Sequence, residues 1–156
     1  MRRTRAASLI VALSVSGLVA WGCAGTGAAT TGAPQASVAS ASASTATGSV
    51  AVELIEGKVT PDPPTAPAGP MTFAIKNIGM NVHEFVVIKT DMKASELPVT
   101  DGVVDESALT VVGQVENIAL RATPTLDIEL APGHYALICN IKDHYGAGMH
   151  ADFEAS

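Results

Sequence analysis

The segment "TLDIELAPGHYALICNI", residues 125–141, carries the clearest fold signal in the chain. Its first part alternates Leu126, Ile128 and Leu130 with polar residues, and this period of two predicts a strand with one buried face. A Pro-Gly pair then interrupts the pattern before a second apolar run, "HYALICNI", begins. Two short strands separated by a turn are therefore expected here.

The same strand pattern recurs throughout residues 49–156. The runs are "VAVELIE" (50–56), "TFAIKN" (72–77), "HEFVVIK" (83–89) and "LTVVGQV" (109–115). About seven short strands separated by Pro- and Gly-containing turns, in roughly 108 residues, predict an all-β, antiparallel β-sandwich. Helical turns are expected only at 106–111 and 92–97. The region 91–123 as a whole is compatible with a short helix, a strand or a long connection.

The first 22 residues have the layout of an export signal. Three arginines lie within residues 1–5, and residues 6–20 carry no charge and are rich in Leu, Val and Ala. A basic start, an apolar middle and a small-residue end are typical of such a signal. An uncleaved membrane-spanning helix would need about 20 apolar residues, more than this run contains.

The end of this segment resembles the lipobox of bacterial lipoproteins, which implies a lipid on Cys23. The alternative is cleavage near Ala24 or Ala28 and release of a soluble protein. In both cases the protein is exported. With the lipid, we expect it in the periplasm or on the outer cell surface, tethered to a membrane.

Residues 23–48 are predicted to form a flexible linker. After Cys23 they contain no charge, and Val38 is their single large aliphatic or aromatic side chain. The folded domain is expected over residues 49–156. Without the three arginines of the signal, six basic residues remain against fifteen acidic ones, a net charge of −9. Such a domain lacks the basic footprint of a nucleic-acid binder and favours basic partner surfaces.

Cys139 stands out because an exported protein usually pairs its cysteines, and the chain offers only Cys23 as a partner. Three interpretations compete. The thiol is a buried small hydrophobe, a catalytic nucleophile, or a metal ligand. The nucleophile needs an orienting third residue, and none is apparent beside His144. The metal interpretation is favoured because "CNIKDHYGAGM" (139–149) also supplies His144 and Met149 at regular spacings of five.

A thiolate, an imidazole and a thioether form a soft ligand set that suits copper. Zinc more often shows paired cysteines or carboxylates, and calcium requires oxygen ligands. One histidine is still missing from this set. His134 lies too far along the same strand and is expected in a solvent-facing turn, and His150 is expected to point away from its neighbour Met149. His83, which opens an apolar strand, is the best remaining ligand.

These residues resemble the pattern of the cupredoxins, the small blue copper proteins. In that family a first histidine opens a strand, and a late loop supplies Cys, His and Met. The resemblance implies one type-1 copper per chain, held by His83, Cys139, His144 and Met149, in a Greek-key sandwich of seven or eight strands. It covers most of residues 49–156. The chain departs from many bacterial relatives at Lys142-Asp143, where they often have Pro-Gly, and at Glu84, where many have Asn or Ser.

The family resemblance implies one-electron transfer to redox protein partners, and not an enzyme. His144, in a loop with small residues, is the expected exit for electrons, and Tyr145 serves there or in packing. A monomer is expected. A copper-handling protein without an electron-transfer role is the alternative. A catalytic copper site is less favoured, because four intramolecular ligands leave no open position and the chain has no His-x-His cluster.

Overall fold

The computed structural model describes residues 48–156. The predicted signal peptide, the Cys23 lipidation site and the linker up to residue 47 lie outside these residues. Eight strands of five residues or more occur in the described part of the chain, and the first of them starts at Gly48. They are β1 (Gly48–Ile55), β2 (Lys58–Asp62), β4 (Gly69–Asn77), β5 (His83–Lys89), β8 (Thr110–Ile118), β9 (Thr125–Leu130), β10 (Gly133–Ile138) and β11 (His150–Ala155).

The shorter elements are three strands of two residues and one 3₁₀ turn. They are β3 (Thr65–Ala66), β6 (Val99–Thr100), β7 (Val103–Val104) and η1 (Glu106–Ala108). The expected helical turn at 106–111 is thus only three residues long and gives way to β8. At 92–97 the chain makes a turn in which the Glu96 N–H donates to the Lys93 carbonyl.

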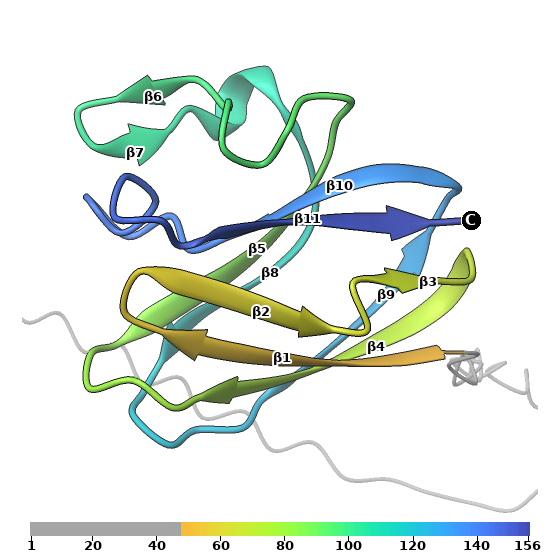
Figure 1. Ribbon diagram of the computed structural model, residues 1–156, viewed down its shortest axis with the longest axis horizontal. Coiled ribbons are helices and arrows are strands. Elements are labelled where there is room, and N and C mark those ends of the chain that lie inside the picture. The colour runs from red at the N-terminus through yellow and green to blue at the C-terminus, as the bar shows by residue number, and fades with distance from the viewer. Residues whose placement is uncertain (1–47) are drawn as a thin grey trace, which may run out of the picture. The chain divides into compact units, whose positions relative to one another are not determined.

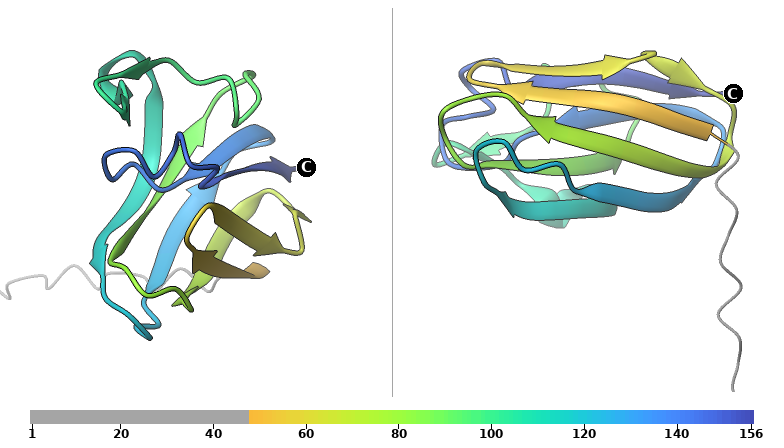
Figure 2. Two further views of the ribbon diagram at one scale, coloured as in Figure 1. Left: turned by 60° about the vertical axis from the view of Figure 1, so that its left-hand side comes forward. Right: turned by 90° about the horizontal axis from the view of Figure 1, so that it is seen from below.

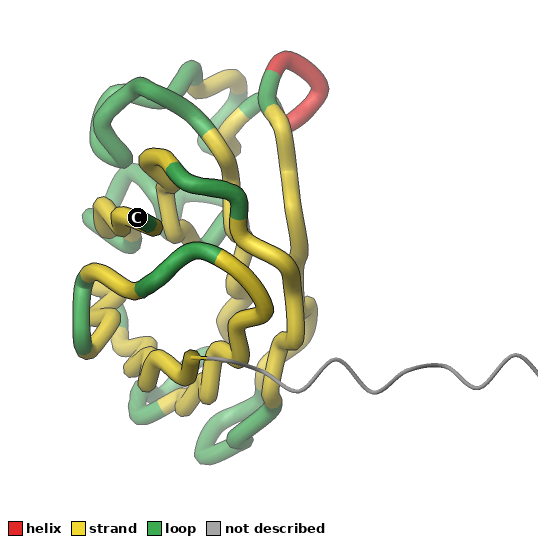
Figure 3. The backbone as a smooth tube through the Cα atoms, turned by 90° about the vertical axis from the view of Figure 1, so that its right-hand side faces the viewer, coloured by secondary structure: helices red, strands yellow, loops and turns green. Residues whose placement is uncertain are grey.

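Two sheets form the predicted β-sandwich (Figure 1). One has the strand order β2-β1-β4-β9, and the other has the order β3-β11-β10-β5-β8. Most neighbouring strands are antiparallel, as expected, but β1 pairs with β4 in parallel and so does β11 with β3. Figure 2 shows the two layers from other sides, and Figure 3 shows the backbone strands of both sheets in a view turned by 90°.

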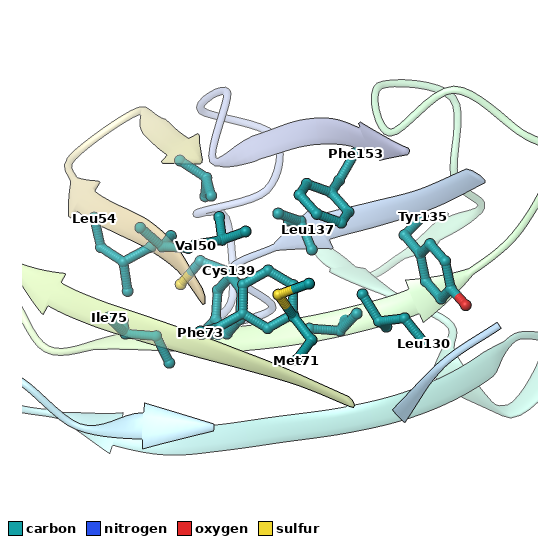
Figure 4. Close-up of a cluster of buried hydrophobic side chains, with 14 of the residues drawn as sticks. Val50, Leu54, Met71, Phe73, Ile75, Leu130, Tyr135, Leu137, Cys139 and Phe153 are labelled. Atoms are coloured by element: carbon teal, nitrogen blue, oxygen red, sulfur yellow. The ribbon is translucent and has the colours of Figure 1, made fainter. Parts of the chain in front are cut away.

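The core forms where the inward-facing side chains of both sheets meet. Val50, Val52 and Leu54 of β1 are all fully buried, as the period of two predicts. They pack with aromatic side chains, and the rings of Phe73 and Phe85 lie 5.4 Å apart. Figure 4 shows side chains of this cluster as sticks, with Phe73 and Phe153 among those labelled. The interdigitated core fixes how the two sheets sit on each other.

Residues 90–109, here called the insert, cover the outer face of the β10–β5 pair. Ala94, Leu97 and Val104 of the insert form a second buried cluster with β-strand residues that point away from the main core, such as Val86 and Ile138. Both faces of β5 are therefore buried, which explains its continuous apolar run. Figures 1 and 2 place β6 and β7 on the side of the molecule away from β1 and β2.

No helix within residues 48–156 is long and apolar enough to cross a membrane.

Candidate metal centre

His83 is the first residue of β5 and is completely buried. The loop before it is fixed by Asn77, a fully buried amide at the end of β4. The Asn77 side-chain Nδ2 donates to the carbonyls of Asn81 (2.8 Å) and Ile118 (2.9 Å), and its Oδ1 accepts the N–H of Gly79 at 2.9 Å. One buried side chain thus replaces the backbone bonds that the loop cannot make for itself.

Cys139 follows directly after β10 and continues its inward alternation from Leu137 into the core. Figure 4 shows its sulfur among the labelled core side chains near Phe73 and Val50. Its N–H donates to the Met149 carbonyl at 3.0 Å. The Glu84 N–H donates to its sulfur at 3.3 Å, so the residue after His83 is linked to the thiol through the backbone.

The chain between Cys139 and Met149, here called the ligand loop, turns back on itself and brings His144 beside the thiol. The His144 N–H donates to the Ile141 carbonyl at 2.9 Å, and the Met149 N–H donates to the His144 carbonyl at 3.2 Å. These short-range bonds hold the backbone at His144 in place without a regular element.

Three donor atoms converge as a result. Ligand atoms of His83, Cys139 and His144 all lie within 4.8 Å of one another. The Cys139 sulfur is 4.0 Å from His83 Nδ1 and 3.4 Å from His144 Nδ1. The two imidazole rings lie edge to face, with centroids 5.3 Å apart. The sequence singled out these same residues, although His83 and Cys139 are 56 positions apart in the chain.

Met149, the fourth predicted ligand, is also buried beside this cluster. Its backbone bonds both to Cys139 and to His144. Its side chain lines a pocket of about 130 Å³ together with His144, and with Glu56, Gly57 and Ala147. The structure therefore places a thioether residue at the wall of the cluster formed by the other three.

Burial shifts the pKa of two groups of the cluster, Cys139 and His83. Burial raises the pKa of the Cys139 thiol, against the effect of N–H groups from Glu84 and Ile141 that favour the thiolate. Burial, with the neighbouring His144, lowers the pKa of His83, while Glu56 acts in the opposite direction. The site thus presents a neutral imidazole of His83 and a thiol whose proton a metal ion has to displace.

The donor chemistry fits copper. Two imidazoles, one thiol and a nearby thioether make the soft set that copper prefers. Two observations on His83 support this fit. Its Nδ1 faces the Cys139 sulfur. Its other ring nitrogen, Nε2, is buried without a hydrogen-bond partner.

Two other histidines lie outside the cluster. His134 is the second residue of β10 and not a turn residue. Its Nδ1 contacts the Thr90 carbonyl (2.8 Å) and its Nε2 contacts Asp152 (2.9 Å). His150 is half-buried, with its ring centroid 5.2 Å from that of Tyr145.

Two side chains of the ligand loop bind the insert by hydrogen bonds, and this contact is here called the clasp. The Tyr145 hydroxyl donates to the Ala94 carbonyl at 2.8 Å and accepts the Leu97 N–H at 3.0 Å. The side chain of Asn140 accepts the Val104 N–H at 2.7 Å and donates to the Val104 carbonyl at 3.1 Å. Tyr145 is only 5% exposed, so of its two expected roles the structure favours packing.

The departure at Lys142-Asp143 has a local explanation. Asp143 has φ of +68°, a left-handed conformation that glycine adopts freely and that Asp tolerates better than most residues. Its N–H donates to the Gly102 carbonyl of the insert at 2.8 Å. Asp143 thus adopts the backbone conformation suited to the glycine of the Pro-Gly pair.

Glu84 lies half-buried beside the site. Burial raises the pKa of its carboxyl, and the nearby charges of Glu106 and Glu116 add to the effect. It is the Glu84 N–H, and not this carboxyl, that contacts the thiol.

Asn77 and Glu56 were not identified from the sequence. A signal for Asn77 is present, since it continues the inward series Phe73, Ile75 of "TFAIKN" as a polar residue on a buried face. Glu56 has no such signal. It lies in the β1–β2 turn, and its carboxylate approaches His83 only through the fold.

Comparisons with known proteins identify the family and the fold. A family model described as a cupredoxin-like domain matches residues 27–149. Comparison with curated proteins gives no match. Among solved structures, reduced auracyanin from the photosynthetic bacterium Roseiflexus castenholzii is 18% identical, with a TM-score of 0.52, covering 71% of this chain and 98% of its own.

Two further solved structures are similar. Auracyanin B is 16% identical with a TM-score of 0.52, and the match covers 72% of this chain and 91% of that one. Rusticyanin from Thiobacillus ferrooxidans is 16% identical with a TM-score of 0.50, covering 69% and 76%. At these identities the structures show a shared fold. With the family model spanning most of its length, the chain belongs to the family of cupredoxin-like domains.

Proposed function

We propose that this protein carries single electrons through one copper ion held by His83, Cys139, His144 and Met149. The observation that carries the proposal is the convergence of two imidazoles and a thiol within 4.8 Å. When bound, copper supplies the one-electron chemistry by alternating between Cu(I) and Cu(II). Fast transfer then depends on how little the protein has to move.

The fold supports a rigid site. His83 is anchored at the start of a strand that is buried on both faces, and Cys139 follows a neighbouring strand. The amide of Glu84 and the backbone of Met149 hold Cys139 on two sides. Ligands fixed by packing and surrounding hydrogen bonds keep nearly one geometry in both oxidation states, which lowers the reorganisation that transfer requires.

His144 is the favoured point of electron exit. His83 is fully buried, whereas His144 is partly exposed and its neighbours Gly146 and Ala147 are exposed small residues. A partner can therefore come close to the His144 ring edge.

The end of the sandwich that holds the site also has features of a docking surface. Five exposed apolar side chains lie in the loops and strand ends on the way to and beside His83: Ile55, Ile78, Met80, Val82 and Leu120. Exposed apolar surface of this kind is typical of an interaction site when it is contiguous. The net charge of −9 over residues 48–156 favours a basic redox partner.

An exported protein anchored by a lipid on Cys23 fits this role. The linker that follows would allow a monomeric domain to meet partners near a membrane. Mass spectrometry of the mature N-terminus tests the anchor: a mass that includes acyl chains on Cys23 supports it, and an unmodified N-terminus near Ala24 or Ala28 contradicts it.

Adding Cu(II) to the purified protein and recording the visible spectrum tests the copper site. We expect an intense blue band from thiolate-to-copper charge transfer, lost in Cys139→Ser and retained in the control His134→Gln, whose side chain lies outside the cluster. Reversible one-electron reduction of the blue form would support a carrier. A colourless complex that binds only Cu(I) and exchanges it readily would instead indicate copper handling.

A further inference from the structure

One buried polar atom of the centre has no hydrogen-bond partner. His83 Nε2 is shielded from solvent and unsatisfied. The nearest charged group is the carboxylate of Glu56, whose Oε1 lies 3.8 Å away. This separation is within ion-pair range but longer than a hydrogen bond.

The Glu56 carboxylate is held in place by the loop before His83. Its Oε1 accepts the N–H groups of Met80 (2.6 Å) and Asn81 (2.8 Å), and also the Asn81 side-chain Nδ2 at 3.1 Å. A surface glutamate usually samples many rotamers, but these three bonds restrict this one. The carboxylate is therefore built into the site although its side chain is 41% exposed.

Gly79 provides the space in which the two groups face each other. A Cβ at this position would lie 2.8 Å from His83 Nε2 and 2.8 Å and 2.9 Å from the two Glu56 oxygens. No side chain larger than hydrogen fits between the imidazole and the carboxylate without displacing one of them. The buried Gly79 thus permits their close approach.

The tautomer follows from this arrangement. Nδ1 of His83 faces the Cys139 sulfur, so Nδ1 is the nitrogen that would hold the metal and Nε2 would carry the proton. The Glu56 carboxylate is the charged group nearest to that Nε2, at 3.8 Å. A carboxylate beside a ligating imidazole orients the ring and increases its basicity, and its negative charge favours the more positively charged state of the site.

We propose that Glu56 is a positioning residue of the copper centre, which orients His83 through its Nε2–H and stabilises Cu(II) relative to Cu(I). The proposal rests on the proposed function, because it requires copper at the site. It adds a negative group from the β1–β2 turn, outside the strands and loop that supply the ligands.

A purely structural role for Glu56 is the competing explanation, since it also anchors Met80 and Asn81. Glu56→Gln separates the two roles. The amide oxygen of Gln still accepts the loop N–H groups, but the negative charge beside His83 is gone. Glu53→Gln is the matched control, because Glu53 is an exposed glutamate of β1 and the substitution makes the same change in net charge.

The experiment measures the reduction potential of the copper-loaded full chain by spectroelectrochemistry. We expect Glu56→Gln to lower the affinity for Cu(II) relative to Cu(I) by about tenfold, which raises the potential by about 59 mV for a one-electron couple. Glu53→Gln should leave the potential at the wild-type value. Equal potentials in Glu56→Gln and Glu53→Gln would overturn the proposal.

Nitrogen NMR of the imidazoles in the Cu(I) protein gives an independent readout. The Nε2–H resonance of His83 should shift in Glu56→Gln and stay unchanged in Glu53→Gln. If Glu56→Gln loses its blue colour, Glu56→Asp takes its place. Asp keeps the negative charge but holds it one methylene farther from His83, so the potential should rise. An unchanged potential in Glu56→Asp would overturn the proposal. Failure of the wild type to form a blue complex would contradict the proposed function instead.

Discussion

Cys139 is the residue whose chemistry the surrounding structure changes most directly. Burial raises the pKa of its thiol above the ordinary range of about 8.5 to 9, and only the thiolate binds a metal. The metal-free site therefore holds a proton on the sulfur to which the ion is to bind. Because that proton leaves on binding, affinity is linked to pH.

We predict that Cu(II) affinity rises about tenfold per pH unit near pH 8, where imidazoles are ordinarily neutral, and continues to rise above about pH 8.5. Competition with a chelator of known protonation behaviour measures this slope. Cys139→Ser is the control, and its slope should be flatter because no thiol proton is released. A wild-type affinity that levels off below about pH 8.5 would show a thiol without a raised pKa.

For single residues, the sequence was sufficient to predict which side chains come together at the site. It was not sufficient to predict Asn77 and Glu56, which hold the loop before His83. Cys139 and His144 are close in sequence, and His83 is marked by its place at the start of an apolar strand. Glu56 is different, because it reaches His83 through a turn 27 positions earlier. The parallel pairing of β1 with β4 brings that turn to the loop before His83.

The ligand loop is the element in which backbone conformation matters most. Asp143 has a left-handed backbone, which costs an ordinary L-residue roughly 1–2 kcal/mol and glycine much less. The Asp143 N–H donates to the Gly102 carbonyl of the insert from this conformation. The position therefore constrains which residues the loop accepts.

We predict that Asp143→Gly is more stable than Asp143→Ala by about 1 kcal/mol, measured by urea unfolding of the metal-free protein. The control pair is Asp91→Gly and Asp91→Ala, at an exposed bend that is not among the left-handed positions. There, glycine should be no better than alanine. An advantage for alanine at both positions would mean that the left-handed backbone at 143 carries no strain.

Strands were more predictable than the insert. "VAVELIE" and "HEFVVIK" form strands because their patterns reflect burial that every strand of a sandwich shares. Residues 90–109 have no such period, because their order comes from separate contacts to Tyr145, Asn140 and the outer face of β5. Contacts of this kind connect distant positions and leave no local signature in the sequence.

The whole domain is strongly acidic, with a net charge of −9 over residues 48–156. Charge of one sign steers the approach of small redox reagents, and salt screens it over a Debye length that shrinks from about 30 Å at 0.01 M to about 3 Å at 1 M. The sign of the salt effect should therefore depend on the charge of the reagent.

We predict that electron transfer between the copper-loaded protein and hexaammineruthenium slows as ionic strength rises, whereas transfer with ferricyanide accelerates. Stopped-flow measurements of the blue band give both rate constants. Each reagent is the control for the other, because a salt effect unrelated to the charge of the reagent would change both rate constants in the same direction. Slopes of equal sign would show that the net charge does not govern access to the site.

The clasp between the insert and the ligand loop also bears on how this domain can be rebuilt. Exchanging residues 139–149 alone for a loop without Asn140 and Tyr145 would remove the bonds to Ala94, Leu97 and Val104. The insert would then still cover the sheet, but without its hydrogen bonds to the ligand loop. The transferable module is therefore the loop and residues 90–109 together, two segments that have to be inherited as a pair.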